Sequence, residues 1–316
     1  MEGQTKGKII AVVGPTASGK TALAIEIAKK YGGEVVSCDS MQIYKGMDIG
    51  TAKPTEDEMC GIKHHMIDIV SPHQSYSAAD FAENAKAVIN GILSRGALPV
   101  LAGGTGLYID SVINNIKFGE SPGSSKLRAE LAEFAEKKGS DALFRELRKK
   151  DPAAAEKIHP NNVRRVIRAL EVCILTGRTF TEVSLEARGE REYDALIFGL
   201  DMERSVLYER INKRVDIMMK KGLLAEVRRL RDMGVGPRTT AMQAIGYKEL
   251  MQYLCGDISL DAAVEKIKLE SRRYAKRQLT WFRRNEEIIW LLLQECYSFD
   301  KICEKCFTFI NKFGIL

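Results

Sequence analysis

The run Gly14-Pro15-Thr16-Ala17-Ser18-Gly19-Lys20-Thr21 decides the fold of this chain. It fits the pattern G-x-x-x-x-G-K-[ST] at every required position. An apolar, β-branched run at 8–13 precedes it and predicts a buried strand, while 20–30 after it predicts a helix. A glycine-rich loop in this context wraps an anion, because glycine has no Cβ and successive N–H groups point at phosphate oxygens. The sequence therefore predicts a phosphate-binding loop (P-loop), rather than a chance match in a structural turn.

The two residues that end the P-loop have separate expected roles. Lys20 adds a positive charge beside a diphosphate, and the Thr21 hydroxyl is a ligand for Mg²⁺. The loop by itself indicates a bound di- or triphosphate and says nothing of hydrolysis. No Asn-Lys-x-Asp signature is present, which argues against a GTPase.

Strand and helix patterns alternate on both sides of a long helical segment. Strands are predicted at 8–13, 34–37, 98–102, 195–200 and 288–292; helices at 20–30, 79–93, 107–113, 204–233 and 264–282; and helical pattern through 126–175. The fold class predicted is α/β: a P-loop NTPase-like parallel sheet core with a helical insertion domain. We place the core at 1–120 and 195–316, the latter with basic helices, and the insertion at 121–194.

Composition places the chain among globular proteins. Of its 316 residues, 45% are hydrophobic and 28% are charged. No apolar run reaches the roughly 18 residues that span a bilayer, and no signal peptide is recognisable, so no membrane association and a cytoplasmic location are expected. The net charge of +6 permits an anionic partner. Seven cysteines give no disulfide framework, and the lone pair Cys303 and Cys306 lacks the further ligands of a zinc site.

Two further loops are expected at the same edge of the sheet as the P-loop. The strand at 34–37 leads to Asp39, and the strand at 98–102 leads to Gly103-Gly104-Thr105-Gly106. Ligands of parallel sheets bind at the carboxyl ends of strands. Asp39 is therefore a candidate metal ligand or general base, with a turn or helix-cap role as the alternative. The pair His64-His65 lacks metal-ligand spacing and favours a packed or hydrogen-bonded pair.

Three helices carry clusters of basic residues. Arg164, Arg165 and Arg168 follow Asn161-Asn162, and two more clusters occupy 204–221 and 266–284. Single clusters are usually solvated helix faces. Three of them make a nucleic-acid phosphate backbone a candidate partner, with solvated helix faces as the alternative. Trp281, among the last cluster, is expected to pack in the core.

Taken together, these motifs resemble those of the bacterial tRNA dimethylallyltransferases (tRNA isopentenyltransferases) over nearly the whole chain. The matching runs are at 14–21, 39–54, 64–68, 76–81, 103–108, 159–172, 244–249 and 271–282. The resemblance implies transfer of a dimethylallyl group from dimethylallyl diphosphate to N6 of the adenosine 3′ of the anticodon in tRNA. It also implies that the P-loop holds the donor's diphosphate rather than ATP for hydrolysis.

The resemblance assigns roles residue by residue. The catalytic residues would be Asp39, Thr105 and Arg214, with Asp39 as the base and Arg214 on the leaving diphosphate. The tRNA contacts would be Asp39, Ser40, Met41, Gln42, Thr105, Arg128, Asn161, Asn162, Val163, Arg164 and Arg165. Mg²⁺ is the expected cofactor, and the insertion would grip the anticodon stem-loop of a tRNA bound by a monomer. The alternatives are a P-loop small-molecule kinase, an RNA-binding NTPase without group transfer, and an enzyme that prenylates free AMP.

Overall fold

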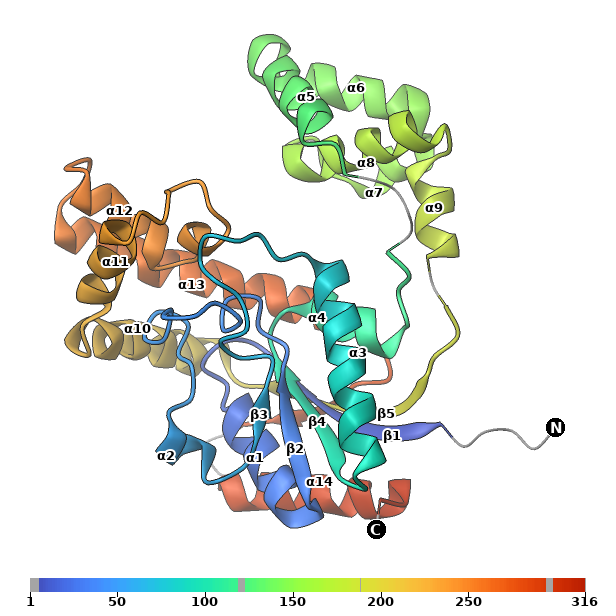
Figure 1. Cartoon of the computed structure of the whole chain (residues 1–316), viewed down its shortest axis with the longest axis vertical. Helices are drawn as coiled ribbons and strands as arrows, with labels where there is room; N and C mark the ends of the chain where they lie inside the picture. Colours follow the sequence, from blue (N-terminus) through green and yellow to red (C-terminus); the bar gives the residue numbers. More distant parts are fainter. Residues whose placement is uncertain (1–5, 119–122, 188, 294–297, 316) are drawn as a thin grey trace. The chain divides into compact units, whose positions relative to one another are not determined.

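The computed structural model of the chain describes residues 6–118, 123–187, 189–293 and 298–315. Its centre is a six-stranded sheet in the order β3-β2-β4-β1-β5-β6, with every pairing parallel (Figure 1). The strands are β1 Gly7–Val13, β2 Gly33–Ser37, β3 His64–His65, β4 Leu98–Gly103, β5 Tyr193–Asp201 and β6 Ile289–Leu292. The parallel α/β fold predicted from the sequence is confirmed.

Helices cover both faces of this sheet. On these faces lie α3 Ala78–Ser94 and α4 Gly106–Ile113 on one side and α1 Lys20–Tyr31 and α14 Phe299–Phe313 on the other. The same unit also contains α2 Glu56–Met59, α10 Arg204–Lys220, α11 Leu223–Asp232, α12 Tyr247–Leu254 and α13 Leu260–Phe282, with a 3-10 turn at Ala241–Gln243. Alternate residues of β1 point to opposite faces. On one face Ile9 packs against α3 and α4, and on the other face Ile10 packs against α1 and α14.

The chain divides into two compact units. One is Met1–Ile113 with Glu192–Leu316, and the other is Asn114–Arg191. The second unit contains α5 Ser125–Lys138, α6 Ser140–Lys150, α7 Pro152–Lys157, α8 Val163–Thr176 and α9 Phe180–Glu186. Its ends lie together, since Asn115 Nδ2 donates to Glu190 O at 2.8 Å and Arg191 Nη2 donates to Asn114 Oδ1 at 3.1 Å. These bounds begin and end a few residues before the 121–194 segment placed from the sequence.

Two details of the predicted elements differ in the structure. The single helix predicted over 204–233 is wrong, because the chain breaks at Gly222, whose φ of 100° is left-handed, and this separates α10 from α11. The last helix, α14, is absent from the sequence prediction, and Cys303 and Cys306 are buried on it among the apolar residues of one sheet face. Trp281 packs, partly buried, at the edge of the core. Among the described residues, no helix combines the length and apolar character that a membrane span requires.

Candidate active site

The P-loop joins β1 to α1 at the centre of the sheet. Its curvature depends on left-handed backbone at Gly19, with a φ of 91°, and at Ala17, with a φ of 64°. Gly14 has a φ of 143°, and a Cβ added there would lie 2.6 Å from the backbone O of Leu200. Lys20 opens α1, and its Nζ donates to Pro15 O at 2.6 Å. The loop thus closes on itself as a cradle in front of a helix N-terminus.

One side chain in the cradle has no partner. Ser18 is 2% exposed, and its hydroxyl has no hydrogen bond within the part of the chain that the structure describes. A buried hydroxyl without a partner is costly, so such groups are normally satisfied by a ligand, an ion or water. An anion held in the cradle would supply the missing acceptor.

The electrostatics of the cradle favour a polyanion. Burial, together with the neighbouring Arg214 of α10, lowers the pKa of Lys20 to about 7, while Asp39 acts in the opposite direction. Burial also lowers the pKa of Arg214, again against the influence of Asp39. Two partly buried cations therefore repel each other, with Asp39 acting on both of them and Glu58 on Arg214 in the opposite direction. A bound diphosphate would favour the charged form of both cations.

Asp39 and Thr105 follow β2 and β4 at the edge of the sheet that also carries the P-loop. Asp39 Oδ1 accepts a hydrogen bond from Met41 N at 2.8 Å, which is the turn role that the sequence left open. Thr105 Oγ1 accepts from Ser40 N at 3.0 Å and donates to Ser40 Oγ at 3.3 Å. These bonds hold the two loops together, as expected where neighbouring parallel strands end side by side.

A cavity of about 330 Å³ brings together five of the candidate residues of this unit, Thr16, Asp39, Ser40, Met41 and Arg214, while Lys20, Thr21, Gln42 and Thr105 do not line it. Its polar wall includes Thr16, Asp39, Ser40 and Arg214, and its apolar wall comes from α10 and α13. The other lining residues are Met41, Gly50, Thr51, Ala52, Ile211, Val215, Met218, Leu223, Gln243, Ala244, Ile245, Gly246, Lys248, Ile267, Ser271, Tyr274 and Arg277. The arrangement places an anion cradle, a carboxylate and an apolar surface around one space.

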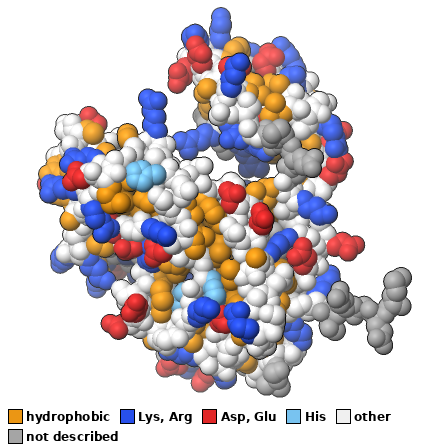
Figure 2. Space-filling view, in the orientation of Figure 1, with side chains coloured by type: hydrophobic (Ala, Val, Ile, Leu, Met, Phe, Trp, Pro, Cys, Tyr) orange, Lys and Arg blue, Asp and Glu red, His pale blue; other side chains and the backbone are white. Residues whose placement is uncertain are grey.

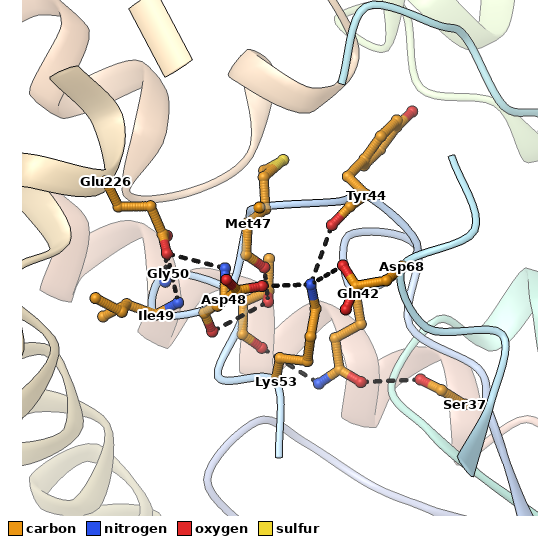
Figure 3. Close-up of polar contacts among 12 residues, drawn as sticks. Ser37, Gln42, Tyr44, Met47, Asp48, Ile49, Gly50, Lys53, Asp68 and Glu226 are labelled. Atoms are coloured by element: carbon orange, nitrogen blue, oxygen red, sulfur yellow. Dashed lines mark hydrogen bonds and ion pairs between the residues drawn. The ribbon is translucent and has the colours of Figure 1, made fainter. Parts of the chain in front are cut away.

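The side-chain amide of Gln42 forms hydrogen bonds with other residues of the chain. Its Oε1 accepts a hydrogen bond from Ser37 Oγ at 2.9 Å, and its Nε2 donates to the backbone O of Thr51 and of Ala52, each at 3.3 Å (Figure 3). The amide therefore connects the end of β2 to a segment that lines the cavity.

Gln278 of α13 is a site residue that sequence reasoning missed. It is 5% exposed, and its Oε1 accepts from Thr16 N at 2.9 Å while its Nε2 donates to Gly104 O at 2.9 Å. It thereby ties the P-loop to the loop that carries Thr105. The 271–282 run in which it lies was recognised as part of a basic helix and as a matching run of the family, but neither signal distinguishes Gln278, and its two partners are far away in the sequence.

We expect Gln278→Leu to lower the free energy of unfolding by about 2 kcal/mol or more, because it leaves the partly buried Thr16 N–H and the buried Gly104 C=O unpaired. Urea unfolding measures this. Thr280→Ala is the matched control, since it removes an exposed hydrogen bond to Lys276 O on the same helix. Equal losses of unfolding free energy in the two variants would contradict the role of Gln278 in tying the two loops together.

The helical unit holds the other candidate residues. Glu171 is fully buried, and its carboxylate accepts from Arg128 Nε at 2.8 Å, Arg168 Nη1 at 2.6 Å and Ser124 N at 2.8 Å. Burial alone would raise the pKa of Glu171, but these hydrogen bonds outweigh it and lower the pKa. Both guanidinium groups thus have a fixed position while remaining partly exposed.

The start of α8 is basic. Asn162 caps the helix by accepting from Arg165 N at 3.4 Å, and Asn161, Arg164 and Arg165 are exposed around it. Val163, the first helical residue, is half-buried. Positive charge at a helix N-terminus interacts unfavourably with the helix dipole. Arg164 and Arg165 therefore do not stabilise the helix itself. A phosphate there would interact favourably with both. Figure 2 shows Lys and Arg side chains gathered along one edge of the helical unit.

The adjacent residues His64 and His65 form structural contacts, as the sequence favoured. His65 Nε2 lies 2.5 Å from Glu34 Oε2, and Glu34 also accepts from Arg95 Nη2 at 3.0 Å. His64 Nδ1 lies 2.8 Å from Ile62 O. Both histidines lie on the edge strand β3, and neither lines the cavity.

Comparison with known proteins gives concordant matches. The family model "IPP transferase" matches residues 42–285. The tRNA dimethylallyltransferase of Acetivibrio thermocellus is 50% identical over 308 residues, covering 97% of this chain and 98% of that protein. That of Shouchella clausii is 50% identical over 306 residues, covering 97% and 98%.

Solved structures agree with these relatives. The tRNA isopentenylpyrophosphate transferase of Bacillus halodurans superposes with a TM-score of 0.74 at 47% identity, covering 97% of this chain and 96% of that one. A eukaryotic dimethylallyltransferase solved acting on tRNA gives a TM-score of 0.82 at 31% identity, covering 97% and 79%. Sequence identity at this level over nearly the whole chain confirms the resemblance found in the motifs. The chain belongs to the IPP transferase family of tRNA dimethylallyltransferases.

Proposed function

We propose that this chain transfers the dimethylallyl group of dimethylallyl diphosphate to N6 of the adenosine 3′ of the anticodon in tRNA. The observation that carries the proposal is the cavity that joins the anion cradle, Asp39, Arg214 and an apolar wall. Such a space suits a donor with a diphosphate at one end and a five-carbon group at the other. Membership of the family and the relatives' activity on tRNA support the acceptor.

The reaction needs a stabilised leaving group. As the bond between C1 of the allyl group and the diphosphate oxygen breaks, negative charge grows on the diphosphate. Lys20, Arg214 and the backbone N–H groups at the start of α1 would stabilise that charge. These groups are fixed before the reaction, so no reorganisation is needed at the moment of bond breaking. The P-loop in this reading binds a leaving group and hydrolyses nothing.

The nucleophile needs a base. The N6 lone pair of adenine is delocalised into the ring, so the amine attacks C1 efficiently only as its proton leaves. We assign that proton to the carboxylate of Asp39, which lines the cavity. Thr16 lines it too, and Thr105, bonded to Ser40 of the same wall, lies beside it. The target base has to leave the anticodon-loop stack to enter the pocket.

Mg²⁺ is proposed as the cofactor, with the Thr21 hydroxyl as its ligand from the protein. The described residues contain no group of three or more His, Cys, Asp or Glu that could hold a metal ion. Mg²⁺ is commonly bound through few protein ligands together with substrate phosphates and water, which fits a lone hydroxyl beside a diphosphate cradle. When bound, it would neutralise part of the charge on the leaving diphosphate.

We assign the exposed basic start of α8, together with Arg128, to the tRNA backbone. Reversing the charge of Arg164 and Arg165 (both to Glu) is expected to weaken tRNA binding and to lower the slope of log Kd against log salt by roughly one unit for each phosphate that is no longer neutralised. Fluorescence anisotropy over a salt series measures it. Reversal of the exposed Lys137 and Lys138 in the same unit is the control. A salt slope equal to that of the control would exclude the two arginines.

The experiment that tests the proposed function is incubation with labelled dimethylallyl diphosphate, unmodified tRNA and Mg²⁺, followed by nucleoside analysis. Label in N6-dimethylallyl adenosine of the tRNA is the expected result. Phosphate transfer from ATP to a small acceptor would indicate a kinase, and ATP turnover stimulated by RNA without label transfer would indicate an NTPase. Label in free AMP but not in tRNA would indicate a nucleotide prenyltransferase.

A further inference from the structure

Residues 47–53, which we call the strap, form one wall of the cavity. Gly50, Thr51 and Ala52 of the strap line the same space as Asp39 and Arg214. Ala52 has a φ of 49°, in the left-handed region that non-glycine residues rarely adopt. Such a conformation costs roughly 1–3 kcal/mol and persists only where surrounding contacts enforce it. The strap therefore depends on groups outside its own backbone.

The main anchor is a carboxylate from a distant helix. Glu226 of α11 is 6% exposed, and its Oε2 accepts from the backbone N of Asp48 and of Ile49, each at 2.9 Å. Its Oε1 accepts from Gly50 N at 3.1 Å and from the Tyr247 hydroxyl at 2.6 Å. Figure 3 shows the carboxylate facing these three successive N–H groups. Charge-assisted bonds to three consecutive amides fix the path of the strap as it enters the cavity wall.

Two more side chains hold the other half of the strap. Gln42 donates to the backbone O of Thr51 and of Ala52. The Lys53 Nζ donates to Tyr44 O at 3.1 Å, Asp48 Oδ1 at 2.6 Å and Asp68 Oδ1 at 2.5 Å (Figure 3). These contacts hold residues 51–53 and the Asp48 side chain, while among the three anchors only Glu226 accepts from the backbone amides of residues 48–50.

The strap presents an uncharged surface to the cavity. The Thr51 hydroxyl donates to Met47 O at 2.6 Å, which occupies its polar group within the strap. The strap thus contributes Gly50, Thr51 and Ala52, none of them charged, to a cavity that Ile211, Val215 and Met218 of α10 also line. A surface of this kind suits a small alkyl group better than a diphosphate.

We propose that Glu226 is a positioning residue that holds the strap as the wall for the five-carbon group of the donor. The inference rests on the proposed function, since it names the part of that site which the alkyl group occupies. Glu226 lines no part of the cavity itself and acts through the backbone of residues 48–50. Its neutralisation should therefore loosen the alkyl wall while leaving the anion cradle intact.

The test uses Glu226→Gln in the full chain. A glutamine offers one acceptor oxygen, and its amide N–H groups oppose the amides of the strap, so the strap shifts. We expect KM for dimethylallyl diphosphate to rise by at least about tenfold, with a smaller fall in kcat. Calorimetry without tRNA should show weakened binding of dimethylallyl diphosphate and unchanged binding of inorganic pyrophosphate. The Kd for tRNA should also stay unchanged.

Arg229→Ala is the matched control. Arg229 lies on the same helix and its Nη2 donates to Gly46 O at 2.7 Å, just before the strap and outside the cavity lining. This variant removes another contact between α11 and the same loop, so donor KM should stay within twofold of wild type. Equal effects of Arg229→Ala and Glu226→Gln would overturn the proposal, because both would then report general loosening of α11.

Gly50→Ala perturbs the strap directly. A Cβ at Gly50 would lie 2.5 Å from Cε2 of Tyr247, whose hydroxyl donates to Glu226, so this substitution displaces the strap against its anchor while the Glu226 carboxylate is kept. If Glu226→Gln does not fold, Gly50→Ala provides the test in its place. We expect the same selective loss of donor affinity, and a double variant whose effect is less than the product of the single effects.

Unchanged donor affinity in the folded variants, equal losses for pyrophosphate and donor, or a loss confined to tRNA would each overturn the role of Glu226. A wild-type protein that binds the donor but transfers nothing would instead refute the proposed function. That outcome leaves the comparison of donor and pyrophosphate binding valid.

Discussion

Asp39→Asn is expected to lower kcat by at least about a hundredfold while leaving the affinity for tRNA nearly unchanged, because general-base catalysis contributes factors of this size. The asparagine oxygen can still accept the hydrogen bond from Met41 N that Asp39 Oδ1 accepts in the structure. The turn therefore survives, and the variant removes the basicity of the side chain alone. Steady-state kinetics with tRNA and dimethylallyl diphosphate measure the change.

Asp39→Ala separates the two roles of this residue. It removes the base and the turn bond together, so catalysis by the base predicts that both variants lose kcat to a similar degree. A purely structural role predicts the opposite pattern, with the asparagine variant close to wild type and only the alanine variant impaired. Thermal unfolding of both variants shows how much the turn contributes to stability.

The second large effect is expected at Lys20. Lys20→Met should raise KM for dimethylallyl diphosphate by roughly tenfold to a hundredfold, because this factor corresponds to the net free energy of a hydrogen bond to a charged group. It should lower kcat as well. The ammonium group would contact a diphosphate whose charge grows as the donor ionises, so its contribution increases toward the transition state. Initial-rate kinetics and calorimetry with inorganic pyrophosphate measure it.

The folded protein should tolerate this substitution. Burial and the neighbouring Arg214 lower the pKa of Lys20 to about 7, so the free protein already disfavours the charge. Removing it should leave the thermal midpoint unchanged or raise it, which separates lost binding from lost folding. Lys29→Met on the exposed side of α1 is the control, since Lys29 forms an exposed ion pair with Glu26 there. Unchanged pyrophosphate affinity in Lys20→Met would contradict the assignment of the P-loop to the diphosphate.

Local pattern predicted those parts of the site that lie at strand ends. The P-loop, Asp39 and Thr105 each follow an apolar strand, and parallel pairing brings the ends of β1, β2 and β4 to one edge of the sheet. Arg214 was placed by resemblance alone, because nothing in the pattern of α10 distinguishes it from the other bases of that helix. Its position close to Lys20 is a tertiary result.

By itself the sequence determined the parallel sheet, the anion cradle and the family, since these depend on short apolar runs, glycines and motif spacing that can be recognised locally. Only the tertiary structure decided how the cavity is closed. Glu226 reaches backbone amides 176 to 178 residues earlier, and Gln278 reaches Thr16 across 262 residues. Hydrogen bonds from a side chain to a distant backbone leave no periodicity in the sequence, because their partners come together only when the chain folds.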